Sequence, residues 1–164
     1  MDKKPIRHVL IYFSGSQDVA ASFETLTSLG ITHICNVGAM VENFFPDQFT
    51  YKRLEILDIP EADLLSSLPA CIDFISHALK PRQDQQQQKP HSAERAAAAH
   101  NPNVFVHCNA GVSRSAAVCI GYIMNKYGKH YDQALAEVKA ARPCVRPNDG
   151  FVKQLKEYEN TTLR

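Results

Sequence analysis

The chain has 164 residues, of which 45% are hydrophobic and 21% are charged, as expected for one globular domain with a sizeable core. Its formal net charge of +1 argues against nucleic acid or an anionic membrane as the main partner. No apolar stretch approaches the ~20 residues that span a bilayer, and the first residues show no signal-peptide pattern. Five scattered cysteines favour neither a disulfide framework nor a zinc site, and they fit the reducing cytoplasm, with the nucleus as a second expected location.

Strands and helices alternate through the first part of the chain. Three β-branched or aromatic runs predict strands, at residues 7–13, 31–37 and 50–57. The first run is expected to close in a turn at residues 14–16. Between the first two strands, Asp18 is a suitable cap for a single helix over residues 19–29, which Gly30 would end.

The segments around the third strand combine a loop and a helix. Residues 38–49 are predicted to be a loop, whose aromatic side chains are interpreted as packing residues: Phe44, Phe45 and Phe49. After Pro60, a helix is expected to begin at Ser66 or Ser67 with Pro69 in its first turn. Its apolar residues recur at steps of three and four and should face the core: Leu68, Cys71, Ile72, Ile75 and Leu79.

Residues 80–102 differ in character from the rest of the chain. They contain a glutamine run at 85–88 and an alanine run at 96–99, and they show no apolar periodicity. Such a segment buries too little surface to offset its ordering entropy. We therefore interpret it as a surface insertion that acts as a tether, with a short helical piece near residues 93–100.

The second half predicts a short buried strand at residues 104–106, followed only by helices. These helices are expected over residues 116–124, 132–141 and 151–159. Strands interleaved with helices and then helices alone predict an α/β fold: one domain over residues 1–164, with a central, mostly parallel, twisted sheet flanked by helices on both faces. The functional site should lie at the carboxyl end of a strand.

The most informative stretch runs from His107 to Ser115, between the predicted strand and the helix that follows it. A helix N-terminus offers unpaired N–H groups and a partial positive charge, which attract an anion and favour the thiolate form of a nearby cysteine. Gly111 permits a tight turn, and the planar fork of Arg114 matches two phosphate oxygens. The stretch therefore predicts a cradle for a tetrahedral oxyanion with Cys108 at its floor. A purely structural role for Cys108 becomes remote beside these neighbours.

The same stretch carries the pattern His-Cys-x5-Arg-Ser/Thr and resembles the signature of the protein tyrosine phosphatase family. Three further segments resemble the dual-specificity branch of that family, at residues 14–18, 57–64 and 141–151. The resemblance spans residues 6–160, interrupted by the insertion, and it is strongest to the atypical subgroup, which has no kinase-docking domain. It implies the phosphatase-like fold of that family. The insertion separates Asp58 from Cys108 by 50 positions, so the assignment of Asp58 rests on its local motif.

The resemblance also implies a role for each residue of the site. Cys108 would attack phosphorus, Asp58 would serve as general acid and then base, Ser115 would hydrogen-bond the sulfur, and His107 would orient the loop. The phosphate would be held by the Arg114 guanidinium and by the backbone N–H groups of six residues: Asn109, Ala110, Gly111, Val112, Ser113 and Arg114. No metal or other cofactor is required. Glu61 and Asp63 are alternative candidates for the acid.

The expected substrates are proteins that carry phosphotyrosine, phosphoserine or phosphothreonine, with members of mitogen-activated protein kinase pathways among them. A phosphoinositide or an RNA 5′-triphosphate is the alternative, but four side chains of the loop are uncharged: Asn109, Ala110, Val112 and Ser113. A phosphate-binding scaffold without activity is a further alternative. Outside the loop, Arg142 is interpreted as a structural tie rather than a substrate contact. Arg146 is a candidate for binding an acidic or doubly phosphorylated peptide, and Asn148 is interpreted as a turn former.

Overall fold

One parallel sheet forms the centre of the molecule. The structure is a computed structural model and describes residues 14–80 and 102–162. Its four strands lie in the order β1-β4-β2-β3: β1 Ser14–Gly15, β2 Ile31–Gly38, β3 Thr50–Ile56 and β4 Asn103–His107. All three strand pairings are parallel. The carboxyl ends of the four strands therefore lie at one edge of the sheet, and β4 leads directly into Cys108 at that edge.

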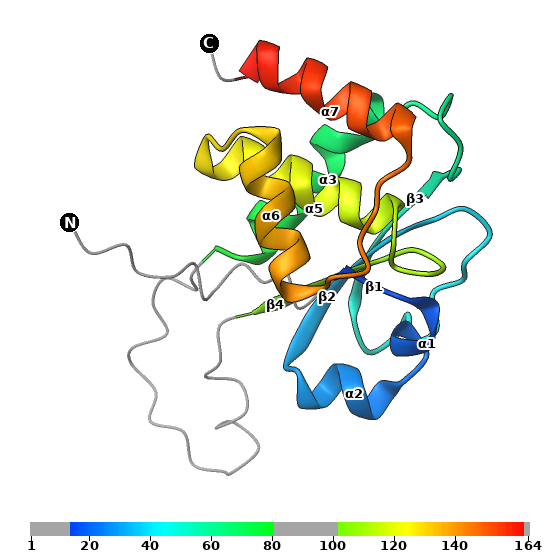
Figure 1. The fold of residues 1–164 in the computed structure, drawn as a ribbon. Coiled ribbons are helices and arrows are strands. Elements are labelled where there is room, and N and C mark those ends of the chain that lie inside the picture. Colours follow the sequence, from blue (N-terminus) through cyan, green and yellow to red (C-terminus); the bar gives the residue numbers. More distant parts are fainter. Residues whose placement is uncertain (1–13, 81–101, 163–164) are drawn as a thin grey trace, which may run out of the picture.

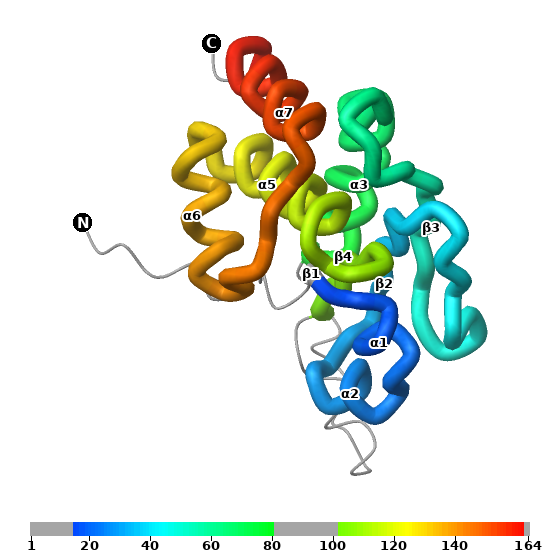
Figure 2. The backbone as a smooth tube through the Cα atoms, turned by 45° about the vertical axis from the view of Figure 1, so that its right-hand side comes forward, coloured from blue at the N-terminus to red at the C-terminus, as the bar shows by residue number. Residues whose placement is uncertain are grey.

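Helices cover both faces of this sheet, as predicted (Figure 1). One face carries α3 Leu64–Ala78, α5 Arg114–Tyr127, α6 Tyr131–Ala141 and α7 Asp149–Thr162, and the other face carries α1 Gln17–Ala20 and α2 Phe23–Ser28. Figure 2 shows α1 and α2 on the side of the molecule away from α6 and α7. Successive strand residues point to opposite faces, so Cys35 joins the larger core while Ile34 joins the smaller one.

The larger core surrounds α5. Every residue of α5 from Arg114 to Met124 is buried, because α3, α6 and α7 all pack around this helix. A helix that is enclosed on every side needs a sequence without a polar face, which the run from Ala116 to Met124 provides. Gly128, with a φ of 62°, ends the helix in the left-handed conformation that glycine adopts without strain. None of the described helices has the length and apolar character needed to cross a bilayer.

The helix predicted over residues 19–29 is in fact two short helices, so this prediction was wrong. The side chain of Ser22 accepts a hydrogen bond from the backbone N–H of Thr25 at 3.3 Å and caps α2. A serine in that role stops one helix and starts the next. The apolar spacing did not reveal this break, because α1 and α2 both direct residues into the same small core, namely Ala20 and Leu26.

Helix α3 begins at Leu64, before the predicted start at Ser66 or Ser67. Asp63 accepts from the N–H of Ser66 at 3.0 Å, and Gln154 Oε1 accepts from the N–H of Leu64 at 2.8 Å. The earlier start places Pro69 inside the helix rather than in its first turn. One of the two caps comes from a residue on α7, so local sequence rules could not locate this terminus.

Residues 14–16 also differ from the prediction. Ser14 and Gly15, expected in a turn, form β1 and pair with Val106 and His107 of β4. The strand predicted over 7–13 and the insertion helix predicted near 93–100 lie outside the described residues. The other predicted elements occur with bounds shifted by a few residues. Cys71 is fully buried in the larger core. Phe45 packs against the smaller core and lies edge to face on Phe23, with 5.3 Å between ring centroids.

Candidate active site

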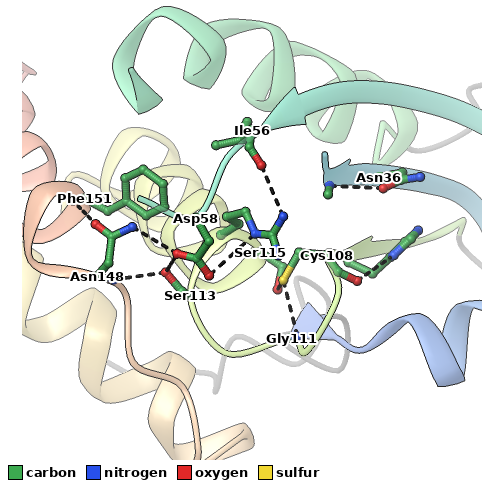
Figure 3. A network of polar contacts seen from close by, with 12 residues as sticks. Asn36, Ile56, Asp58, Cys108, Gly111, Ser113, Ser115, Asn148 and Phe151 are labelled. Carbon is green, nitrogen blue, oxygen red and sulfur yellow. Dashed lines mark hydrogen bonds and ion pairs between the residues drawn. The ribbon is translucent and has the colours of Figure 1, made fainter. Parts of the chain in front are cut away.

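The candidate site lies at the carboxyl edge of the sheet, where three loops meet. The loop of residues 108–113, here called the phosphate loop, joins β4 to α5. Residues 57–63, here called the acid segment, join β3 to α3, and residues 142–148 join α6 to α7. Figure 3 shows side chains from all three loops pointing toward one another.

The backbone of the phosphate loop turns its carbonyl groups outward. Four consecutive carbonyl oxygens accept hydrogen bonds from outside the loop: Asn109 from Gln17 N (2.8 Å), Ala110 from Arg142 Nη2 (3.3 Å), Gly111 from Arg142 Nε (3.0 Å) and Val112 from Arg146 N (2.8 Å). In a trans peptide, the N–H of the next residue points the opposite way from the carbonyl. The N–H groups of residues 110–113 therefore face the inside of the loop, and the loop is a ring of donors suited to an anion.

Gly111 is required by the close packing of this loop on β1. Its φ is 69°, and a Cβ atom at this position would lie 2.4 Å from the carbonyl carbon of Gly15. Any other residue would therefore be strained and would also clash with the backbone. The segment that follows β1 thus supports the phosphate loop from below, and Gln17 holds its first carbonyl.

Cys108 lies at the floor of the ring and is only 1% exposed. Its Sγ accepts a hydrogen bond from the N–H of Gly111 at 3.3 Å and lies 3.4 Å from Ser115 Oγ (Figure 3). Hydrogen bonds donated to sulfur favour its anionic form. The position of Ser115, the second residue of α5, therefore suits the predicted stabilisation of a thiolate.

Arg114 reaches from the start of α5 toward the end of β3. Its Nη1 donates to the carbonyl oxygen of Ile56 at 3.2 Å, and its Nε lies 3.6 Å from Asp58 Oδ2. That buried Nε has no hydrogen-bond acceptor within the part of the chain that the structure describes. A buried donor of this kind calls for an acceptor, and a phosphate oxygen is one that a guanidinium binds well.

Asp58 points toward the mouth of the phosphate loop. Its Oδ1 accepts from Ser113 Oγ at 2.6 Å and from Asn148 Nδ2 at 3.0 Å, as drawn in Figure 3. The carboxylate therefore lies beside Arg114 with its side chain 35% exposed, close to any group that the loop would hold. The alternative acid Asp63 instead caps α3, so the geometry favours Asp58.

Asn148 makes contacts at the candidate site that its interpretation as a turn former did not anticipate. Besides its bond to Asp58, its backbone N–H donates to Ser113 Oγ at 3.0 Å, and its Oδ1 accepts from the N–H of Phe151 at 2.9 Å. One side chain thus caps α7 and also holds the predicted acid. The only signal for it was the family-like motif at residues 147–151.

The start of α7 supports the acid segment in two further ways. A Cβ atom at Gly150 would lie 1.9 Å from the carbonyl oxygen of Pro60, so the helix contacts the segment directly. Gln154 Nε2 donates to the carbonyl of Ala62 at 2.9 Å. Sequence reasoning gave no reason to select Gln154, because its partners lie about 90 positions away.

Asn36, also missed, positions the turn after β2. It is fully buried; its Nδ2 donates to the carbonyl of Val41 at 2.8 Å, and its Oδ1 accepts from the N–H of Gly38 at 3.1 Å. This turn touches the site, because a Cβ atom at Gly38 would lie 3.3 Å from the Cα atom of Cys108. A lone asparagine within a strand carries no sequence signal for such a role.

His107 and Arg142 lie where a structural role would place them. His107 is fully buried, its Nδ1 lies 3.2 Å from the carbonyl oxygen of Cys108, and its ring stacks on Phe105. Burial lowers the pKa of His107, and the bond to the Cys108 carbonyl only partly opposes this shift. The neutral ring is therefore the favoured form. Arg142 contacts two carbonyl groups of the phosphate loop, which agrees with its interpretation as a tie.

Comparison with known proteins gives consistent matches. Residues 91–161 match a family model described as "Dual specificity phosphatase, catalytic domain". Dual specificity protein phosphatase 19 of the mouse, Mus musculus, is 43% identical over 146 residues, which cover 88% of this chain. The chain spans 57% of the length of that relative.

Solved structures give the same result over nearly the whole chain. The human tyrosine phosphatase-like serine/threonine/tyrosine-interacting protein superposes with a TM-score of 0.75 and 33% identity, over 92% of this chain and 91% of that one. Human DUSP28 superposes with a TM-score of 0.69 and 33% identity, over 91% of each chain.

Proposed function

Because this chain belongs to the dual specificity phosphatase family, we propose that it is a protein phosphatase. It hydrolyses phosphotyrosine and phosphoserine or phosphothreonine through a cysteinyl-phosphate intermediate. The observation that carries this proposal is the ring of inward N–H groups around Cys108 Sγ, with Arg114 and Asp58 beside it. Nucleophile, anion holder and acid thus lie together at one edge of the sheet.

The first chemical step transfers the phosphoryl group to sulfur. The Cys108 thiolate forms a bond to phosphorus while the bond to the leaving oxygen breaks, and protonated Asp58 gives its proton to that oxygen. Arg114 and the N–H groups of residues 110–113 hold the equatorial oxygens, where negative charge is redistributed. Ser113 and Asn148 position the carboxyl group, because both contact its Oδ1 atom.

The second step releases phosphate and restores the enzyme. Asp58, now a carboxylate, removes a proton from a water molecule that attacks phosphorus, and the bond between phosphorus and sulfur breaks. The hydroxyl of Ser115, 3.4 Å from the sulfur, stabilises the departing thiolate. Acid catalysis matters most for phosphoserine and phosphothreonine, because their alkoxides are poor leaving groups.

The loop side chains support phosphoproteins rather than highly charged phosphate esters. Asn109, Ala110, Val112 and Ser113 are uncharged, whereas a phosphoinositide or a 5′-triphosphate would need extra cations for its additional charge. Proteins of kinase pathways, including mitogen-activated protein kinase pathways, are the substrate group that family membership suggests. We propose the cytoplasm and nucleus as locations, since a catalytic thiolate needs a reducing compartment.

The test compares four substrates with the purified chain: a small aryl phosphate, a phosphotyrosine peptide, a phosphothreonine peptide and a short-chain phosphoinositide. We expect turnover of the first three and at least about tenfold lower kcat/KM on the last, since the loop lacks cations. The Cys108→Ser variant should lose turnover by about 10⁴-fold or more.

Two outcomes would contradict the proposal. Comparable rates for Cys108→Ser and the unaltered chain would show that the reaction does not pass through a cysteinyl-phosphate. Binding of phosphopeptides without any turnover by the unaltered chain would favour a phosphate-binding scaffold. A correctly folded Cys108→Ser variant, checked by its melting temperature, makes both comparisons valid.

A further inference from the structure

Three large apolar side chains are exposed in the turn directly after β2 and in the acid segment. Met40 is 92% exposed, Leu57 54% and Ile59 44%. Leu57 and Ile59 flank Asp58, and Met40 lies in the turn that follows β2. A single exposed apolar residue needs no explanation, but a group of them beside a site marks an interaction surface.

These three residues lie within reach of the phosphate loop. The N–H of Ala39 donates to the carbonyl of Ile56 at 3.3 Å, which ties the turn of Met40 to the start of the acid segment. Met40 is two residues, or at most about 7 Å of chain, from Gly38, which touches Cys108. Leu57 and Ile59 are each about 3.8 Å from Asp58 along the chain, Cα to Cα. A peptide with its phosphorylated side chain in the loop must pass near them.

The backbone of Met40 carries independent information. Its φ is 62°, and it is the one non-glycine residue with positive φ among residues 14–80 and 102–162. A side chain in this conformation costs free energy that a glycine avoids. The turn itself is held by the hydrogen bond from the N–H of Val41 to the carbonyl of Gly38 (3.2 Å) and by the Asn36 side chain. The Met40 side chain is almost fully exposed, so packing within the fold gives no reason for methionine rather than glycine at this position. Strain of this kind points to a use outside the fold.

We propose that Met40, Leu57 and Ile59 form an apolar rim that binds the residues flanking the phosphorylated residue of a protein substrate. The preferred substrates carry leucine, methionine or another large apolar residue next to the phosphorylated one. The flexible thioether of Met40 adapts to different apolar partners. This inference rests on the proposed phosphatase activity and adds the sequence preference of the same site.

The test uses two phosphotyrosine peptides that differ only in the two residues next to phosphotyrosine, leucine in one and serine in the other. For the unaltered chain, kcat/KM should be about tenfold higher for the leucine peptide, as expected for burial of one or two apolar side chains. In the combined variant Met40→Gly, Leu57→Ser, Ile59→Ser, this ratio should fall to about one. Each single substitution should lower it in part.

Two controls separate recognition from stability. Leu29→Ser alters an apolar residue that is 37% exposed near the amino end of β2, away from the site, and should keep the ratio at about ten. Met40→Gly should keep or raise the melting temperature, because it relieves the backbone, and should still lower the ratio. A purely structural Met40 would give the reverse: lower stability and an unchanged ratio.

The outcomes distinguish this inference from the proposed function. Turnover of a small aryl phosphate with a peptide ratio near one would overturn the apolar rim alone. So would a ratio that stays near ten in the combined variant. Absence of turnover on every substrate would overturn the proposed function, and the apolar rim with it.

Discussion

The phosphate loop follows β4 and the acid segment follows β3, two strands that β2 separates in the sheet. Both leave the same edge of the sheet, yet they are held in different ways. The phosphate loop buries Cys108, Gly111 and Ser113. Four of its carbonyl groups are bound by partners on α1 and the α6–α7 loop. The acid segment is largely exposed, and its polar contacts include side chains from three other parts of the chain: Ser113 of the phosphate loop, Asn148 of the α6–α7 loop and Gln154 of α7.

This difference separates two requirements of phosphoryl transfer. The anion holder must be in place before charge develops, so it is built from backbone groups that cannot rotate. The acid must approach the leaving oxygen and exchange a proton with it, so a carboxyl group held by a few side chains is sufficient. Damage to the phosphate loop should therefore affect every substrate, whereas damage to the acid segment should affect substrates in proportion to how poor their leaving groups are.

The largest effect on the acid segment should come from Asp58→Asn, which keeps the shape of the side chain and removes its proton. We expect kcat on a phosphothreonine peptide to fall by about 10²- to 10³-fold, and by much less on an aryl phosphate with an acidic leaving group. The plot of rate against pH should lose the fall in rate at high pH that reflects deprotonation of the acid. An unaltered pH profile would show that Glu61 or another residue, and not Asp58, is the general acid.

Arg142→Ala should damage the phosphate loop without touching the reacting atoms. It removes two hydrogen bonds to the carbonyl groups of Ala110 and Gly111, each worth about 1–3 kcal/mol with a charged donor. We expect kcat/KM to fall about 10- to 100-fold on aryl phosphate and phosphothreonine peptide alike. A loss confined to one of these substrates would contradict the distinction between the two regions.

Asn148→Ala tests the side-chain support of the acid segment and should have a smaller effect on activity. We expect about a tenfold loss on phosphothreonine and little change on aryl phosphate, since only the position of Asp58 is disturbed. The variant also loses the cap of α7, which costs about 1 kcal/mol of stability.

A matched variant separates the two roles of Asn148. Asn148→Asp keeps an oxygen that can accept from the N–H of Phe151 and removes the donor to Asp58. It should have a melting temperature closer to that of the unaltered chain and an activity on phosphothreonine at least as low as that of Asn148→Ala. Full activity in Asn148→Asp would show that the contact with Asp58 is unimportant.

The smallest expected effect concerns His107 below the phosphate loop. Burial lowers the pKa of His107 in the folded chain, so as pH falls through about 6.5 the unfolded chain binds a proton that the folded chain does not. Stability should therefore fall on acidification, by at most about 1.4 kcal/mol per pH unit from this residue. Urea unfolding at pH 7.5 and 5.5 should show a weaker pH dependence for His107→Asn. Equal dependence in both chains would assign it to other groups.

The sequence predictions were accurate where a structure depends on residues close together in the chain, and less accurate where it depends on residues far apart in the chain. The three parallel strands and α5–α7 were found from apolar patterns because each pattern reflects burial of a contiguous segment. The break at Ser22 and the start of α3 were not found from these patterns, because a helix cap depends on individual side chains. One cap of α3 is Gln154, which lies on another helix. The position of Asp58 beside the phosphate loop was expected only through the family resemblance.

By itself, the sequence was enough to predict the proposed nucleophile and its anion holder. Cys108, Gly111 and Arg114 lie within seven residues at a strand–helix junction. Their relative positions therefore depend on a few backbone angles and on one helix terminus. Only the tertiary structure decided what holds the proposed acid. Ser113 lies 55 positions and Asn148 lies 90 positions from Asp58 along the chain. It also decided that Met40, Leu57 and Ile59 are each exposed. Such side-chain contacts leave no periodic pattern in the chain, since they form only after the core has packed.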